Sequence, residues 1–550
     1  MLATIMTNTS CVVNMRLTLV VIVVAMLNSS ALLGQNGVSS SKSAEKLGSV
    51  SFPISCSSAV RPEFERGVAL LHSFQYALAE TSFERVATQD PQCAMAYWGE
   101  AMGLYHPMFD WPDNETLKKG NEYIEQGMKT GVKTERERDY IRAAAAFYQD
   151  NPKLNRNARL SAYSKAMAEV YQRYPQDGEA AAFYALSLLP WYRDDQPQSR
   201  MTALKILKDL FAKEPDNPGA AHYLIHAADS PDLAPQGLEA AHRYAEIAPS
   251  SAHALHMPAH IFSRLGLWQE SVNSNLASAA AAAEATREKH DNESEYQLHA
   301  MHYLLYAYLQ TGRDIDARNV VEEVKSVPEI NDVDVASDEI IMKAIYIMET
   351  RRWEDALQMA PSAHTDPFAE MRIYWVRAIA ASHRGKPHEA RNDVEKLRES
   401  FSRFRKTFPS ASPNNALVLE GEAWLARAQG KNHKAVEKMH AAVKADEFSV
   451  DDESLPAYEL LGDLLSDLHQ PALALEAYES ALKEAPNRFN SLYGAALSAQ
   501  LEGKEDLAKS YFARLVTVAD PGTKRREFQA AKEYLKKSNK HESADSGAKQ

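Results

Sequence analysis

The feature that most constrains this 550-residue chain is a repeat of small residues. Alanines recur at intervals of 39, 34, 45, 39 and 34 residues: Ala317, Ala356, Ala390, Ala435, Ala474 and Ala508. A glycine stands five residues before several of these small positions: Gly312/Ala317, Gly385/Ala390, Gly430/Ala435, Gly503/Ala508 and, more weakly, Gly266/Ser271. Glycine turns the chain between two helices, and alanine lets those helices approach closely. A repeat period of about 20–50 residues therefore predicts a stack of helix pairs.

The clearest copy of the repeat runs from Leu455 to Pro486. It places aromatic, Leu-Gly, alanine and proline residues in a fixed order: Tyr458, Leu461, Gly462, Ala474, Tyr478, Ala481 and Pro486. This order resembles the tetratricopeptide repeat (TPR), and the resemblance extends over roughly residues 60–520. It implies an all-α, right-handed superhelix (an α-solenoid) of TPR-like helix pairs. Such a scaffold binds a protein or peptide partner on the concave face lined by its first helices.

Two blocks are more specific than the general repeat, namely Asp90 to Pro107 and Ala252 to Gly266. They resemble a family of exported bacterial TPR proteins. That resemblance implies membership of the family but no reaction.

The start of the chain predicts export. Leu17 to Leu27 is an apolar run behind Arg16, and small residues up to Ala31 follow it, as in a secretory signal peptide cleaved after Ala31. The run has eleven residues, whereas a membrane-spanning helix needs about 20. An uncleaved amino-terminal anchor is the alternative. We expect a periplasmic or secreted bacterial protein with no membrane span after signal cleavage.

The pattern divides the chain into five parts. Residues 1–31 are the signal peptide, and residues 32–51 are a linker. An amino-terminal TPR-like array with a histidine-rich groove covers 52–330, and a carboxy-terminal TPR array covers 331–525. The polar residues of 526–550 predict a disordered tail.

Composition excludes several classes of function. The formal net charge of −13 argues against a nucleic-acid binder, which needs a basic surface. The sequence contains no His-Glu-x-x-His, Gly-x-Ser-x-Gly or Walker motif, so no catalytic residue is assigned. The sequence therefore favours binding over catalysis.

The cysteines predict one disulfide. Of the three in the chain, Cys11 would leave with the signal peptide, and Cys56 and Cys93 remain as a pair. In an oxidising compartment such a pair forms a bridge. Two free buried thiols are the alternative, because sequence does not give the Cα separation that a bridge requires.

Histidines are concentrated in one region. Nine of the 18 lie between residues 222 and 302. The pairs His222/His226 and His256/His260 have a spacing of four, which places each pair on one helix face. The two pairs lie 34 residues apart, so they are expected to stack on neighbouring first helices. The predicted partner-binding groove comprises His222, His226, His253, His256, His260, His299, His302 and Tyr306.

The same histidines suggest a metal site. Imidazole is the commonest protein ligand of zinc, copper, nickel and iron. His222, His226, His256 and His260 are the candidate ligands, and Asp229 is close enough in sequence to complete or orient the site. The sequence therefore predicts a partner-binding scaffold, with a metal-binding protein or metal-dependent hydrolase as the alternative.

Overall fold

The computed structural model places the chain from residue 45 onward in one compact unit. It describes residues 45–547 except for the gaps 109–111, 150–153, 191–196, 288–292, 330–333, 409–411, 413–414 and 447–454. The predicted signal peptide and residues 32–44 of the predicted linker lie outside the described residues. The described residues are helical and contain no strand, so the predicted all-α solenoid of helix pairs is confirmed. No described helix is both long and apolar enough to cross a membrane.

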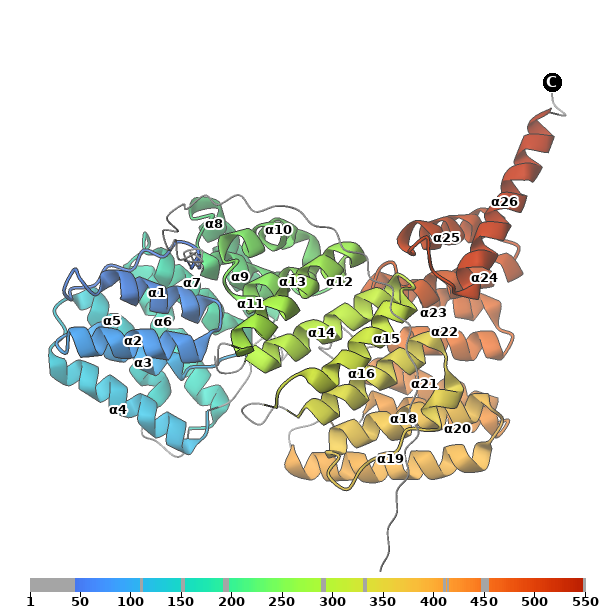
Figure 1. Cartoon of the computed structure of the whole chain (residues 1–550), viewed down its shortest axis with the longest axis horizontal. Coiled ribbons are helices and arrows are strands. Elements are labelled where there is room, and N and C mark those ends of the chain that lie inside the picture. Colours follow the sequence, from blue (N-terminus) through green and yellow to red (C-terminus); the bar gives the residue numbers. More distant parts are fainter. Residues whose placement is uncertain are drawn as a thin grey trace, which may run out of the picture. The chain divides into compact units, whose positions relative to one another are not determined.

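The amino-terminal helices pack as successive neighbours (Figure 1). They are α1 (Arg61–His72), α2 (Tyr76–Gln89), α3 (Ala94–Gly103), α4 (Asn114–Thr130), α5 (Glu135–Tyr148), α6 (Arg156–Arg173), α7 (Gly178–Leu188), α8 (Pro197–Lys213) and α9 (Pro218–Ala228). Aromatic side chains from the first helices of the pairs pack around Phe52, which precedes α1. Its ring centroid lies 5.3 Å from Phe64, 5.2 Å from Trp98 and 4.9 Å from Tyr140. These rings form an aromatic core where α1, α3 and α5 face one another.

The predicted disulfide is present. Cys56 precedes α1 and Cys93 is the residue before α3, and their Cα atoms lie 5.0 Å apart. The bridge ties the segment before the first helix to the start of the second helix pair.

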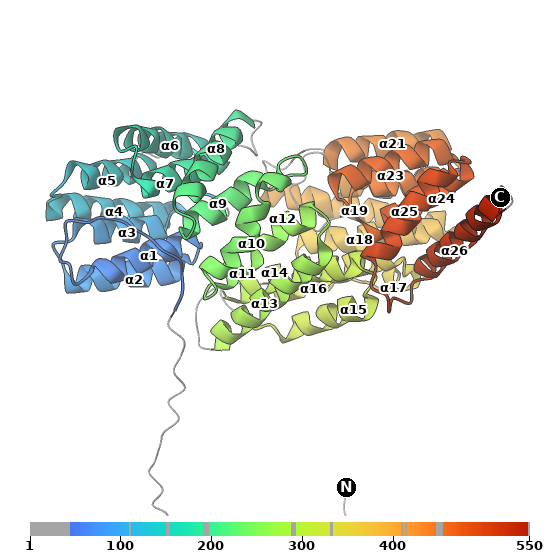
Figure 2. The same ribbon diagram turned by 90° about the horizontal axis from the view of Figure 1, so that it is seen from above.

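The helices in the middle of the chain follow α9, and together with α9 they hold the histidines of the 222–302 region. They are η2 (Ala234–Gln236), α10 (Leu238–Ile247), α11 (Ala252–His256), α12 (Pro258–Arg264), α13 (Trp268–Arg287), α14 (Glu293–Gln310), α15 (Asp314–Glu323), η3 (Val324–Ser326) and α16 (Val335–Thr350). Figure 2 shows α11, α13 and α14 next to one another, and residue contacts join the three helices.

The carboxy-terminal helices repeat the pair pattern. They are α17 (Trp353–Ala356), α18 (Pro367–His383), α19 (Pro387–Thr407), α20 (Ala416–Ala428), α21 (Asn432–Asp446), α22 (Ala457–Asp467), α23 (Pro471–Glu484), α24 (Phe489–Leu501), α25 (Glu505–Val518) and α26 (Arg526–Gly547). Gly462 shows why a glycine is needed in α22, because a Cβ there would lie 2.6 Å from the Tyr478 ring of α23. The backbone of one helix thus rests directly on the aromatic side chain of its partner.

The turns between paired helices follow the predicted glycine pattern. Gly312, Gly385, Gly430 and Gly503 all have a positive φ, between 66° and 72°. This left-handed conformation ends the first helix of a pair at low cost only when the residue lacks a Cβ. All six repeat alanines are fully buried: Ala317, Ala356, Ala390, Ala435, Ala474 and Ala508.

The carboxy-terminal array also contacts the middle of the chain. The backbone N–H of Asp520 donates to the carbonyl of Thr311 at 2.8 Å. Arg525 pairs with Asp314 at 2.7 Å. Arg488, at the start of α24, is fully buried against Glu349 of α16 and Glu459 of α22. The end of the helix array therefore packs onto α14–α16.

The predicted disordered tail differs from the structure. Residues 526–547 form α26, whose first turns bury Phe528 and Ala531. Tyr534 packs on Phe512 of α25 with ring centroids 4.6 Å apart. The prediction of disorder followed the polar composition of the segment as a whole. It did not take into account that these three apolar residues recur every three positions and so share one face of a helix.

Candidate metal centre

Four helices, α9, α11, α12 and α14, bring the histidines of the middle region together. Asn217 caps α9 by accepting from the Ala220 N–H, and α9 carries His222 and His226. Every residue of α9 is buried. The helix is thus central to the packing, and its two imidazoles face other helices rather than solvent.

The second pair of histidines lies across a helix break. Ser251 caps α11, which ends at His256, and Pro258 begins α12, which carries His260. Proline is suited to the first position of a helix because the missing N–H would have no partner there. The expected single helix is therefore two helices, yet Nε2 of His256 still lies 3.1 Å from Nε2 of His260.

The histidines form two groups of three. The outer triad consists of His256, His260 and His299, and the inner triad consists of His222, His226 and His253. Within each triad the potential ligand nitrogens all lie within 4.8 Å of one another. His260 and His299 are half-buried, whereas His256 and the whole inner triad are buried. Three convergent imidazoles offer a transition metal three ligands and leave a coordination position open.

In the outer triad, the hydrogen bonds assign the proton of His256. Its Nδ1 lies 2.7 Å from Oδ1 of Asn275. The amide nitrogen of Asn275 donates to the carbonyl of Ser271 at 2.8 Å, so its oxygen is the atom that faces the ring. His256 therefore donates from Nδ1, and the lone pair is on Nε2.

His260 is oriented in the same way. Its Nδ1 lies 3.0 Å from Oδ2 of Asp229, whose other oxygen accepts from Arg264 at 2.9 Å. Burial alone would raise the pKa of Asp229, but Arg264 and the His260 hydrogen bond outweigh it and hold that pKa far below its usual value. An ionised carboxylate only accepts, so His260 donates from Nδ1 and directs Nε2 towards His256. Asp229, a sequence candidate for orienting the site, holds this position.

The local electrostatics favour the neutral form of two outer-triad histidines, His256 and His299. Burial lowers the pKa of His299 to about 3, and the neighbouring His260 and His302 act in the same direction. The pKa of His256 is also well below its usual value, mainly through burial and then through His299 and His260. Neutral imidazole is the form that binds metal ions.

Two of the sequence-predicted groove residues lie elsewhere. His302 is one turn beyond His299 on α14, and its Nε2 pairs with Asp338 of α16 at 2.7 Å. Tyr306 contacts the buried guanidinium of Arg488. The four predicted metal ligands are divided between the two triads, which His253 and His299 complete. Except for the half-buried His260 and His299, the predicted groove residues are 0–8% exposed and lie between helices.

Among the residues that orient the outer triad, sequence reasoning identified Asp229 but not Asn275. Asn275 is a fully buried amide in the alanine-rich helix α13, and Tyr303 on α14 has its hydroxyl 3.0 Å from Nδ1 of His260. A buried asparagine needs hydrogen-bond partners, but only the structure shows that Asn275 is buried.

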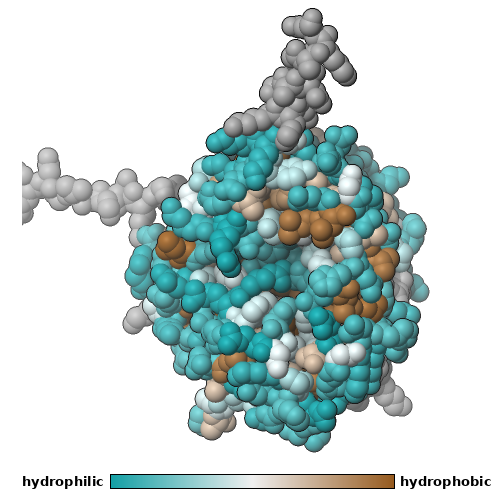
Figure 3. All heavy atoms as spheres, turned by 90° about the vertical axis from the view of Figure 1, so that its right-hand side faces the viewer, coloured by the Kyte–Doolittle hydropathy of each residue, from teal (hydrophilic) through white to brown (hydrophobic). Residues whose placement is uncertain are grey.

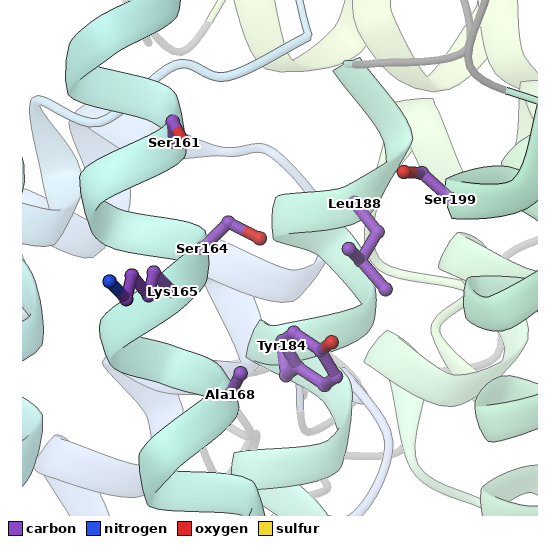
Figure 4. A pocket seen from close by; sticks show the side chains of 7 residues that line it. All are labelled: Ser161, Ser164, Lys165, Ala168, Tyr184, Leu188 and Ser199. Atoms are coloured by element: carbon purple, nitrogen blue, oxygen red, sulfur yellow. The ribbon is translucent and has the colours of Figure 1, made fainter.

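A separate surface pocket of about 270 Å³ lies between α6 and α7. Figure 4 shows its lining, in which Lys165 points away from Ser164. Ser164 instead accepts a hydrogen bond from Ser187 at 3.0 Å. These side chains therefore do not form a nucleophile–base pair.

Comparisons with known proteins do not identify a family. No family model matches the sequence, and no curated protein matches it. Among solved structures, the chain is similar to the crystal structure of yeast Tom70, with 11% sequence identity and a TM-score of 0.29. The match covers 70% of this chain and 94% of that chain. The fold of this chain is therefore described from its own helix pairs.

Proposed function

We propose that this protein is an exported helical-repeat protein that binds a transition metal ion at the outer triad. One observation carries the proposal: Nε2 of His256 and Nε2 of His260 face each other at 3.1 Å while both Nδ1 atoms donate to oxygen acceptors. When both rings are in the neutral form that binds metal ions, their Nε2 lone pairs face each other, and a cation between them is favourable. A metal ion bound by both Nε2 atoms and by His299 removes the repulsion between these lone pairs.

The supporting residues fit the second shell of a metal site. A carboxylate or amide that accepts from the non-coordinating nitrogen fixes the ring orientation and makes the imidazole a better ligand. Asp229 and Asn275 supply these acceptors for His260 and His256. The donor set suits zinc, copper, nickel or iron, and three imidazoles leave a position for water or a small ligand.

Export is supported by the sequence of the first 31 residues and by the Cys56–Cys93 disulfide. Disulfides persist in oxidising compartments such as the bacterial periplasm and the extracellular space. We therefore propose that the metal is bound outside the cytoplasm.

Binding of a protein partner is the second candidate function. Stacked helix pairs provide long surfaces for such partners. Leu497 and Leu501 are one turn apart on α24 and are 37% and 75% exposed. The face seen in Figure 3 is mostly hydrophilic, with hydrophobic side chains in separate patches. A partner would therefore meet small apolar contacts within a polar surface.

The test is a count of bound metal in the mature protein purified without a histidine tag. We expect stoichiometric zinc, copper, nickel or iron after incubation with each ion and removal of the excess. His299→Ala should abolish binding at the outer triad, whereas the exposed His433→Ala should not change the metal content. Unchanged metal content in His299→Ala would contradict the assignment of this site.

A further inference from the structure

We propose that the inner triad, His222, His226 and His253, binds a second transition metal ion next to the first. The geometry of these three histidines supports the inner site independently of the outer one. Only its pairing with an occupied outer triad rests on the function proposed above.

The proton of His222 is assigned by its surroundings. Its Nδ1 lies 2.6 Å from the backbone carbonyl oxygen of His72, which only accepts. His222 therefore donates from Nδ1 and directs the lone pair of Nε2 towards Nε2 of His253, 3.1 Å away. This is the arrangement that also defines the outer triad.

His253 cannot satisfy both of its nitrogens in this structure. Its Nδ1 is buried and has no hydrogen-bond partner among the described residues. If Nε2 carries the proton and donates to His222, a lone pair on Nδ1 is buried without a donor. If Nδ1 carries the proton, that N–H is unsatisfied and two Nε2 lone pairs face each other. Buried polar groups are rarely left in either state.

A metal ion at the triad would resolve both alternatives. It would accept the lone pair that Nε2 of His222 directs towards His253, and neither of those two Nε2 atoms would then face an unshared lone pair.

The end of α1 is shaped around the inner triad. Phe74 has a φ of 54°, which is costly for a bulky residue. Its ring centroid lies 4.4 Å from His222, 5.6 Å from His226 and 5.7 Å from His253. Strained backbone that persists in a buried site is a pointer to function.

The same helix end has the electrostatic sign that a cation prefers. His72 is the last residue of α1, and its carbonyl belongs to the negative end of the helix dipole. This carbonyl accepts from His222, so the dipole acts through a ligand of the proposed ion. Phe74 and His72 together enclose one side of the triad.

Imidazole rings of the two triads are close neighbours. The centroids of His226 and His260 lie 6.2 Å apart, as do those of His253 and His256. The two proposed sites are therefore adjacent, with a ring of one triad in contact distance of a ring of the other. The inner triad is buried and the outer triad is half-buried, so we expect the outer site to exchange metal faster.

The experiment is a zinc titration of the metal-free, full-length mature protein, repeated with copper, nickel and iron. We expect two equivalents of at least one ion per chain, with one equivalent remaining in His253→Ala and one in His299→Ala. The double variant should bind none. Because His253→Ala opens a buried space, His226→Gln provides a second variant, and circular dichroism establishes that each variant is folded.

The outcomes separate the two sites. One equivalent for every ion, lost in His299→Ala and retained in His253→Ala and His226→Gln, would overturn the inner site and leave the outer site standing. One equivalent lost in His253→Ala and retained in His299→Ala would support the inner site and refute the outer one. No stoichiometric binding of any ion would refute both.

Discussion

The guanidinium of Arg488 donates from Nη2 to Oε1 of Glu349 at 2.6 Å, and both side chains are fully buried although 139 residues separate them. Glu459 accepts from the same guanidinium at 2.9 Å. The resulting charge network joins α16, α22 and α24. It stabilises the contact between the carboxy-terminal array and the middle of the chain.

Removing Arg488 is expected to destabilise this contact strongly. Arg488→Met leaves two buried carboxylates without their cation, which typically costs about 3–5 kcal/mol. The change should appear as a lower urea midpoint for the carboxy-terminal helices, followed by circular dichroism. Arg391→Ala, at an exposed position, is the control and should leave the midpoint unchanged. An unchanged midpoint in Arg488→Met would contradict the structural role of the network.

The disulfide should stabilise the amino-terminal helices. Cys56 and Cys93 are separated by 37 residues, and closing a loop of that length contributes roughly 3–4 kcal/mol in the chain-entropy model. The double variant Cys56→Ser, Cys93→Ser should therefore unfold at lower urea concentration. Reductant should shift the parent in the same direction and leave the double variant unaffected. Two alkylatable thiols in the unreduced mature protein would show that the bridge does not form.

Stability should depend on pH through Glu420. Its Oε2 accepts from Trp375 at 2.7 Å, and burial, with a further contribution from Asp446, raises its pKa to about 8. The folded chain thus keeps a proton that the unfolded chain releases above pH 4.5 or so. Between these two values, Glu420 lowers the free energy of unfolding by about 1.4 kcal/mol for each unit of rising pH.

Glu420→Gln should remove this dependence. Gln keeps an oxygen for Trp375 but carries no charge, so the variant should exceed the parent in stability at pH 8 and approach it at pH 4.5. Urea midpoints at both pH values measure the difference. Glu437→Gln, at an exposed position, is the matched control. Equal pH dependence in Glu420→Gln and the parent would refute the assignment.

Asp229 should act on metal affinity without being a ligand. Asp229→Asn weakens the acceptor that orients His260, and loss of such a partner typically costs 10–100-fold in affinity. We expect that loss in a zinc titration against a competing chelator, with stoichiometry restored at saturating zinc. Asp338→Asn is the control, because Asp338 pairs with His302 outside both triads. Equal affinities in Asp229→Asn and the parent would exclude this positioning role.

Local sequence was sufficient to predict the helix pairs and the disulfide partners. The glycine turns and buried alanines depend on spacing within one repeat. Gly430 and Ala435 illustrate this, because a left-handed turn and a close helix contact both arise from residues five positions apart. With Cys11 assigned to the signal peptide, only one cysteine pair remained.

The partners of the histidines were decided by the tertiary structure. His299 and His302 are three residues apart on α14, yet His299 joins the outer triad and His302 pairs with Asp338. His222 lies against His253 instead of His256, its equivalent in the repeat. The break at Pro258 and the packing of α9, α11 and α14 set these distances. The spacing of residues in the sequence determines which helix face a side chain lies on, but it does not determine the angle at which neighbouring helices pack.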